Sequence, residues 1–265
     1  MTAVALHNVS IDIPVYDAAS VSIRKLILGG TTGGHFAQAG SVVIVNALRD
    51  ITFSAKSGDR IGLIGSNGAG KTTLLRVLSG VYCPTSGTVE VEGRVSPLLD
   101  LALGMSPDAT GFENIKICGL LWGLPANEIG SRVDEIAAFT ELGNYLNMPV
   151  RIYSAGMRLR LAFAIATARD PEILLLDETI GAGDAAFYRK AFDRIIQMAQ
   201  QSSVLFIASH SEDIVRNLCN KAIWLESGSL MEFGTVEDVL NKYAAHRDAK
   251  SSGAPTSLHN VTKIA

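Results

Sequence analysis

The stretch YSAGMRLRLAFAIATARDPEILLLDE, from Tyr153 to Glu178, carries the features that decide the fold. Ser154 is a good helix-capping residue and predicts the start of a helix. Ile173 to Leu176 is a short apolar run that predicts a buried strand, and this strand ends in two adjacent carboxylates, Asp177 and Glu178. Because parallel strands present side chains at their carboxyl ends, the pattern indicates an α/β protein with a polar site at that edge.

A glycine-rich loop upstream matches a phosphate-binding pattern. The segment from Gly65 to Thr72 reads GSNGAGKT, follows the apolar run Ile61–Ile64 and precedes a run of helix formers. In this motif the backbone N–H groups surround phosphate oxygens, the lysine (Lys71) reaches the β and γ phosphates, and the hydroxyl of Thr72 helps to hold Mg²⁺. We therefore expect the nucleotide to contact Gly65, Ser66, Asn67, Gly68, Ala69, Gly70, Lys71, Thr72 and Thr73.

The carboxylate pair fits the same chemistry. Asp177 is expected to complete the Mg²⁺ shell, directly or through water, and Glu178 to orient or deprotonate the attacking water. The alternative is an acidic pair placed at a helix N-terminus by the helix dipole. Since phosphoryl transfer requires a metal ligand of this kind, the phosphate-binding loop favours the catalytic interpretation.

Composition and charge restrict the class of protein. The 265 residues are 48% hydrophobic and 18% charged, which predicts one large domain, or a domain with an inserted lobe. The net charge of −3 gives no broad attraction for nucleic acid, so we expect no nucleic-acid partner. No apolar run approaches the roughly 20 residues of a membrane span, and the N-terminus lacks the pattern of a signal peptide. Three scattered cysteines also favour a cytosolic chain.

The order of elements predicts a parallel sheet with packed helices, an antiparallel β subdomain and an inserted helical lobe. Residues 1–246 are expected to form the main domain, with the lobe at about 105–165, and residues 247–265 to form a tail without fixed structure. Expected strands are Val4–Ile13, Val42–Val45, Ile51–Ala55, Arg60–Ile64, Thr88–Val91, Ile173–Leu176 and Val204–Ala208, with a hairpin at Trp224–Leu230. Expected helices are Lys71–Leu78, Ile129–Phe139, Asp184–Gln201 and Val236–Ala245.

Residues Asp17 to Ser41 interrupt this pattern as an insertion. Its glycine patch, Gly29–Gly34, is read as flexible rather than as a second nucleotide loop, because no lysine follows. Within the insertion, apolar residues flank Arg24 and Lys25 and predict a short amphipathic helix. This helix would lie at the membrane face or against a permease, or would cover the protein's own sheet.

Ser154 and Gly156 form a second helix start that could bind an anion. A plain capped helix is the alternative. Within one subunit, the two helix starts could contact the same γ phosphate only if the chain folded back on itself. A symmetric dimer allows both contacts without this. In such a dimer the phosphate loop of one copy faces the Ser154 turn of the other.

At these residues the chain resembles the ATP-binding subunit of ABC transporters. Ser154–Met157 stands where that family has its LSGGQ signature, with Tyr153 in place of leucine, and Asp177–Glu178 matches the end of its Walker B strand. Gly183–Asp184 resembles the D-loop and His210 the switch histidine, all in family order. The resemblance extends from about Val4 to Ala245. It implies an ATPase that uses ATP and Mg²⁺, forms an ATP-sandwich homodimer and works with an integral-membrane permease.

The resemblance also implies roles for further residues. Ser154 and Gly156 would contact the γ phosphate across the dimer, and Asp184 would also belong to the nucleotide-binding residues. His210 would contact the γ phosphate from the same subunit as a catalytic residue. Two positions depart from the family. Asp100 stands near the place of a glutamine that contacts Mg²⁺, and Tyr16 is the best candidate for the adenine-stacking aromatic, although it could equally be a surface tyrosine.

The segments YSAGM, LLDLALGMSPDATGFENI and DETIGAGDAAF are most similar to exporters of O-antigen, capsule and teichoic-acid polysaccharides. The resemblance thus implies an ATPase on the inner face of the cell membrane that drives export of a lipid-linked polysaccharide. About twenty residues after Ala245 are too few for a further sugar-binding domain, so we expect an exporter without one. The alternatives are an exporter of a different substrate, a non-membrane ABC protein acting on ribosomes or DNA, and a regulatory module without turnover.

Overall fold

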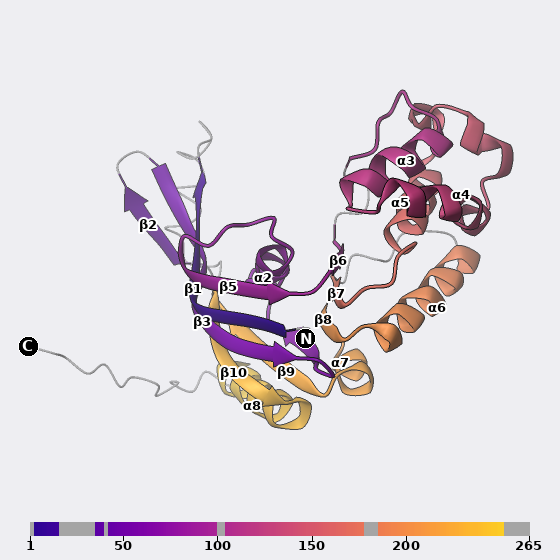
Figure 1. The fold of residues 1–265 in the computed structure, drawn as a ribbon. Helices are drawn as coiled ribbons and strands as arrows, with labels where there is room; N and C mark the ends of the chain where they lie inside the picture. The colour runs from indigo at the N-terminus through magenta and orange to yellow at the C-terminus, as the bar shows by residue number, and fades with distance from the viewer. Residues whose placement is uncertain (1–2, 16–34, 40–41, 100–103, 178–184, 252–265) are drawn as a thin grey trace, which may run out of the picture.

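The computed structural model describes residues 3–15, 35–39, 42–99, 104–177 and 185–251. The described chain forms a large mixed sheet with packed helices and a separate helical lobe at one end of the sheet (Figure 1). No helix within these ranges is both long and apolar enough to cross a membrane.

The strands are β1 (Ala3–Val15), β2 (His35–Ala39), β3 (Val42–Lys56), β4 (Arg60–Ile64), β5 (Ser86–Glu92), β6 (Val95–Leu98), β7 (Ile173–Leu176), β8 (Val204–Ala208), β9 (Lys221–Glu226) and β10 (Ser229–Thr235). The helices are α2 (Lys71–Leu78), α3 (Gly111–Leu121), α4 (Ala126–Thr140), α5 (Ala155–Ala166), α6 (Ala185–Gln201), α7 (Glu212–Leu218) and α8 (Val236–Ser251), with 3₁₀ turns η1 (Gly143–Asn147) and η2 (Val150–Ile152).

The sheet has the strand order β5-β1-β3-β10-β9-β4-β8-β7-β6, and β2 pairs with β3 off this path. Strands β9, β4, β8, β7 and β6 are mutually parallel, whereas β1 pairs antiparallel with β3 and β5. The predicted α/β class, with a parallel core, an antiparallel part and a helical lobe, is confirmed. Because the central parallel strands are covered on both faces, β7 is apolar at all four positions and fully buried.

Side-chain alternation along β4 explains how the strand before the phosphate loop is fixed. Ile61 and Leu63 belong to the core shared with α2, whereas Ile64 packs in the cluster that contains Val215 of α7. Gly62 faces the same side as Ile64, and a Cβ atom placed there would lie only 2.6 Å from Val215 Cγ1. The helix α7 can therefore lie directly on β4 because position 62 has no side chain.

The helical lobe has its own core. Residues of α3, α4 and α5 bury one another, with Ile115, Ile129 and Leu161 each less than 4% exposed. The buried side chain of Asn114 orders the loop before α3, because its amide nitrogen donates to the carbonyl oxygens of Ser106 and Thr110. A polar group buried here is tolerated because its hydrogen bonds are satisfied.

Two elements differ from the sequence prediction. The expected strands Val42–Val45 and Ile51–Ala55 form one strand, β3, because β1 pairs across the polar interval between them, with Ile11 opposite Leu48. Asp50 takes a positive φ of 46°, in a region where the β1–β3 register shifts. Part of the expected insertion also forms a strand, since β2 pairs antiparallel with β3; the amphipathic segment around Arg24 lies outside the described residues.

The closing helix is also longer than predicted. The tail without fixed structure was expected from residue 247, but α8 continues to Ser251. Side chains of its last turns bind β9: His246 and Lys250 contact the carboxylate of Glu226, and the His246 ring lies 4.9 Å from that of Trp224. These contacts are between distant parts of the sequence, so composition alone does not reveal them. Residues 252–265 lie outside the described ranges.

We predict that Gly62→Ala lowers the free energy of unfolding by about 1–3 kcal/mol, since the new methyl group overlaps Val215 and forces α7 away from β4. Urea denaturation measures this change. Combining it with Val215→Ala should cost less than the sum of the two single changes, because the smaller side chain accommodates the methyl group.

Gly130→Ala is the matched control, since Gly130 is exposed on α4 and nothing lies within 4 Å of the added methyl group. It should leave stability unchanged or raise it by up to about 1 kcal/mol. Equal effects of the two alanine substitutions would contradict the proposed packing of α7 on β4.

Candidate nucleotide-binding site

The phosphate loop connects β4 to α2 and forms one wall of a pocket of about 570 Å³. The other walls come from β1 and β3, the β9–β10 hairpin, and the residues that follow β7 and β8. The lining residues are Ile13, Val45, Asn46, Ala47, Asn67, Gly68, Ala69, Gly70, Lys71, Thr72, Thr73, Asp177, His210, Ser227 and Gly228. The structure therefore brings together the phosphate loop, Asp177 and His210, which the sequence places far apart.

At two positions of the phosphate loop, the backbone conformation and the close neighbouring backbone require glycine. Gly65 has φ +144°, and a Cβ atom there would lie 2.2 Å from the carbonyl oxygen of Leu225. Gly70 caps α2 with φ +107°, and a Cβ atom would lie 3.0 Å from the carbonyl oxygen of Ala47. The loop thus lies directly on the neighbouring backbone, which fixes the N-terminus of α2.

The side chain of Lys71 turns back across the loop. Its Nζ atom donates to the carbonyl oxygens of Gly65 at 2.7 Å and Ser66 at 3.1 Å, and the residue is 8% exposed. The Nε2 atom of His210 lies 3.5 Å from Lys71 Nζ, at the pocket end of β8. A buried ammonium group at the N-terminus of a helix is suited to a polyanion such as a nucleotide phosphate chain.

Thr72 and Asp177 meet at the pocket from two different elements. Thr72 lies in the first turn of α2, Asp177 follows β7, and the Thr72 hydroxyl donates to Asp177 Oδ2 at 2.8 Å. Hydroxyl and carboxylate oxygens are the ligands that Mg²⁺ prefers. No cluster of three or more His, Cys, Asp or Glu side chains with the geometry of a metal site occurs in the described ranges. A Mg²⁺ ion held by two protein oxygens and by phosphate oxygens needs no such cluster, so the residues present fit this ion.

The predicted anion site at Ser154 lies on the helical lobe, away from this pocket. Ser154 caps α5, its Oγ accepts from the backbone N–H of Met157 at 3.2 Å, and it is exposed. Around a Cβ atom at Gly156 the nearest atom is Ser154 Oγ at 4.0 Å, so there is room for a side chain at this position. Within one chain the structure does not join this turn to the phosphate loop.

Four predicted site residues cannot be placed. Glu178, Asp184, Asp100 and Tyr16 lie outside the described residues. Their roles remain predictions from the sequence.

The pocket also contains residues that the sequence did not indicate. Ile13 and Val45 are paired across β1 and β3 and give the pocket an apolar side. Ser227 and Gly228 form the turn between β9 and β10, and the N–H of Gly228 donates to the carbonyl oxygen of Ala69 at 3.0 Å. The only sequence signal for this turn was the Ser-Gly pair in the predicted hairpin.

Comparison with known proteins identifies relatives of the whole fold. A family model described as ABC transporter matches residues 48–181. The O-antigen export system ATP-binding protein RfbE of Yersinia enterocolitica is 44% identical over 88% of this chain and 98% of its own length. RfbB of Myxococcus xanthus, with the same description, is 40% identical over 78% of the chain, and the teichoic acids export ATP-binding protein TagH of Listeria monocytogenes serotype 4b is 39% identical over 74%. The chain covers 47% and 58% of the length of these two relatives.

Solved structures agree on the fold. A dimeric ATP-binding cassette in a post-hydrolysis state, bound to ADP and phosphate, matches 88% of this chain and 98% of its own with a TM-score of 0.62 at 19% identity. The ATP-binding subunit of an ABC transporter matches 91% of this chain and 93% of its own with a TM-score of 0.65 at 20% identity. The family model and the sequence relatives confirm the resemblance predicted from the signature motifs, including its polysaccharide-export branch, and the chain belongs to the ABC transporter family.

Proposed function

We propose that this protein is the ATP-hydrolysing subunit of an ABC exporter that drives a lipid-linked polysaccharide, of the O-antigen, capsule or teichoic-acid type, across the inner membrane. The observation that carries the proposal is the identity of 44% to an O-antigen export ATP-binding protein across 98% of that protein's length. Identity at this level extends well beyond the shared phosphate-binding motif. Such a subunit would work on the cytoplasmic face of the membrane beside an integral-membrane permease.

The pocket supports ATP as the substrate. The phosphate loop and Lys71 would bind the β and γ phosphates, and the apolar side formed by Ile13 and Val45 offers a surface for the base. Thr72 and Asp177 would hold Mg²⁺, which neutralises charge on the phosphates during transfer. Tyr16, three residues beyond Ile13 in the chain, is retained as a candidate for stacking on adenine.

Hydrolysis requires a base and a contact to the γ phosphate. Glu178 directly follows Asp177 and is proposed to orient or deprotonate the attacking water. His210 is exposed at the end of β8, 3.5 Å from Lys71 Nζ, where its ring can contact the γ phosphate. Asp184 and Asp100 are proposed to act at the dimer interface and near the metal, respectively, by resemblance to the family.

A second copy would complete the site. Ser154 and Ala155 at the start of α5 are exposed, but they lie on the lobe rather than at the pocket. If two copies pack head to tail, each Ser154 turn lies over the partner's phosphate loop, and ATP binds between them. Closure of the two half-sites then depends on ATP, and separation after hydrolysis follows from charge repulsion.

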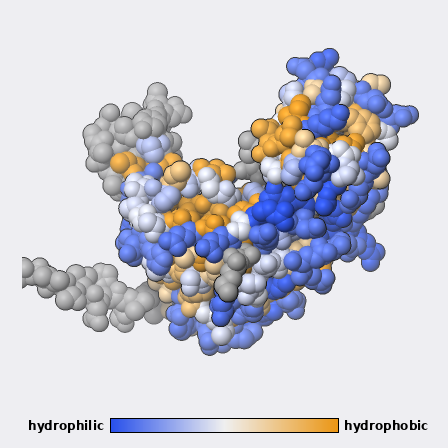
Figure 2. Space-filling model, viewed as in Figure 1, coloured by the Kyte–Doolittle hydropathy of each residue, from blue (hydrophilic) through white to orange (hydrophobic). Residues whose placement is uncertain are grey.

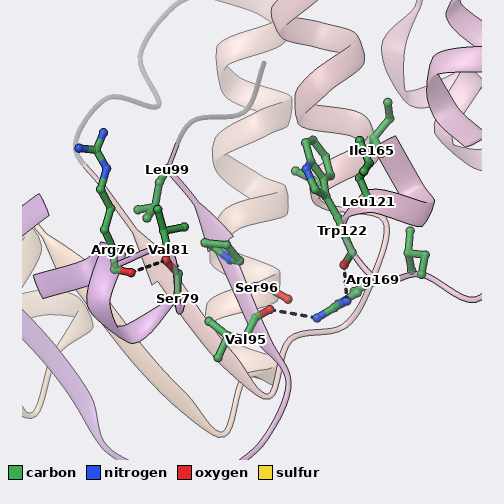
Figure 3. A pocket seen from close by; sticks show the side chains of 14 residues that line it. Arg76, Ser79, Val81, Val95, Ser96, Leu99, Leu121, Trp122, Ile165 and Arg169 are labelled. Atoms are coloured by element: carbon green, nitrogen blue, oxygen red, sulfur yellow. Dashed lines mark hydrogen bonds between the residues drawn. The ribbon is translucent and has the colours of Figure 1, made fainter. Parts of the chain in front are cut away.

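The permease is proposed to bind a cleft of about 570 Å³ where the lobe meets the sheet (Figures 2 and 3). Its rim carries exposed apolar side chains, with Val81 65% and Leu121 64% exposed. Its floor contains the buried Ser96 Oγ, which has no hydrogen-bond partner in the described structure. An amphipathic helix of the permease would cover the apolar rim.

The cleft is also connected to both half-sites. Helix α2 begins at Lys71 in the phosphate loop, and its residue Arg76 lines the cleft together with Ser79 just beyond its end. Helix α5 begins beside Ser154, and its last residues Ile165 and Ala166 line the same cleft. A helix bound there would contact the far ends of both helices whose N-termini are proposed to bind phosphate.

We predict that Lys71→Ala weakens ATP binding at least tenfold, because it removes the buried cation that faces the β and γ phosphates. Equilibrium binding of a fluorescent ATP analogue measures this change. Lys116→Ala, which removes an exposed lysine of α3 on the lobe, is the control and should bind normally. Tight binding by the Lys71 variant would contradict the assignment of the pocket.

We predict that Glu178→Gln forms a stable dimer when ATP is added, since the nucleotide binds but is hydrolysed slowly. Adding Gly156→Asp should prevent this dimer, because the new carboxylate would lie against the partner's γ phosphate. An aspartate in the first turn of α5 has open space and favours the helix dipole, so the fold should be retained. Size-exclusion chromatography with and without ATP checks both variants, and a dimer that persists in the double variant would contradict the sandwich.

A further inference from the structure

A single guanidinium group bridges the two walls of the cleft. Arg169 Nη1 donates to the carbonyl oxygen of Trp122 at 2.8 Å, and its Nη2 donates to that of Val95 at 3.0 Å (Figure 3). Trp122 caps the C-terminus of α3 on the lobe, whereas Val95 is the first residue of β6 in the sheet. We refer to this pair of hydrogen bonds as the Arg169 bridge.

The two carbonyl oxygens of the bridge suit a donor group that is charged and planar, such as a guanidinium. Arg169 is half-buried, and burial lowers the pKa of its guanidinium, with a further contribution from the charge of Arg94. An arginine nevertheless remains protonated in proteins, so both carbonyl oxygens accept charge-assisted hydrogen bonds. The fork of the guanidinium contacts two acceptors at once, which a lysine at this position would do less well.

The position of Arg169 in the chain gives the bridge a mechanical consequence. It follows the last residue of α5, Ala166, by three residues, and α5 begins beside Ser154. Because a helix transmits a displacement along its length with little bending, the orientation of α5 fixes where Ser154 lies relative to the sheet. The bridge ties the C-terminal end of α5 both to the lobe and to the strand next to β7.

Two other arginines bind the adjacent carbonyl oxygens without crossing the cleft. Arg132 of α4 donates to the carbonyl oxygen of Ala168, a contact within the lobe. Arg194 of α6 donates to the carbonyl oxygen of Thr167 at 3.1 Å, and neither arginine lines the cleft. Arg169 therefore differs from its neighbours because its two acceptors lie on opposite walls.

We propose that Arg169 is a positioning residue: its bridge sets the angle between lobe and sheet, and so places the Ser154 turn where a second copy's phosphate loop can meet it. This inference rests on the ATP-sandwich function proposed above. ATP binding to the phosphate loop of one chain does not involve the bridge, whereas closure of the two half-sites does. A loss of the bridge should therefore separate ATP affinity from ATP-dependent dimerisation.

The first test compares Arg169→Met with Arg132→Met, which removes a similar side chain and a hydrogen bond from the same segment within the lobe. In the full chain, Arg169→Met should bind ATP within about twofold of the unmodified protein but hydrolyse it about tenfold more slowly, as expected from the loss of a charge-assisted hydrogen bond. In the Glu178→Gln background its dimer should need about tenfold more protein to form. Arg132→Met should change neither quantity beyond about twofold.

Arg169→Lys, which keeps the charge but not the planar fork, should give intermediate values. If Arg169→Met does not fold, the lysine variant provides the same comparison. Equal defects in the Arg169 and Arg132 variants would overturn the proposal, because they would reflect a general loss of stability. So would normal turnover and dimerisation in Arg169→Met.

A second measurement observes the lobe directly. Spin labels on Asn127→Cys, exposed on α4, and Glu90→Cys, exposed on β5, report the distance between lobe and sheet once the exposed Cys83 is replaced by serine. Loss of the bridge should broaden this distance distribution, and an unchanged distribution would count against the proposal. The proposed function is tested separately, by ATP binding to the Lys71→Ala variant and by the ATP-dependent dimer of Glu178→Gln.

Discussion

The hydrogen bond between Thr72 and Asp177 joins two segments that are 105 residues apart in the chain, and the candidate site depends on it. The contact exists because β4, β8 and β7 are adjacent and parallel, so their carboxyl ends open at the same edge of the sheet. The phosphate loop follows β4, His210 follows β8 and Asp177 follows β7. Strand order therefore brings the groups proposed to bind phosphate, metal and the γ phosphate to one edge of the sheet.

The same strand order determines how the lobe is attached. The chain leaves the sheet after β6 and returns at β7, and these two strands are direct neighbours. At the opposite ends of these strands, the N–H of Arg94 donates to Glu172 Oε2 at 3.0 Å, and the N–H of Ile173 donates to the carbonyl oxygen of Arg94. The lobe is thus inserted at one edge of the sheet, and α6 also contacts it, through the ion pairs of Lys190 with Glu141 and of Arg194 with Glu135. An arginine that spans this junction can therefore affect a turn at the far end of α5.

The local sequence pattern was sufficient to predict an element where a site motif stands at the end of a strand or at the start of a helix. The bounds of α2, β4, β7 and β8 match the predicted ranges, because in each an apolar run or a helix-forming run begins or ends at a glycine, a serine or a charged residue. The convergence of Asp177 and His210 on the phosphate loop followed from the parallel sheet. Family membership followed from the order of short motifs along the chain, which carries more information than any one motif.

The structural features that the sequence did not predict depend on contacts between residues far apart in the chain. The continuity of β3 is imposed by β1, and the last turns of α8 by Glu226 and Trp224, neither of which local polarity reveals. The acceptors of Arg169 are backbone carbonyl oxygens 47 and 74 residues away in the chain. Any residue type can supply a carbonyl oxygen, so no side-chain pattern could have indicated them.

The separation of the phosphate loop and the Ser154 turn within one chain is the reason for proposing a site that needs two copies. One chain presents its phosphate loop on the sheet and its Ser154 turn on the lobe, and the described structure keeps the two apart. A γ phosphate bound to Lys71 can therefore meet a Ser154 turn only from another molecule. The distance between the two turns in one chain then sets how well two copies fit together. We propose that this distance is adjusted at the cleft where α2 and α5 end, which is also the surface proposed for the permease. A partner helix bound in this cleft would change the fit of the dimer without contacting the nucleotide.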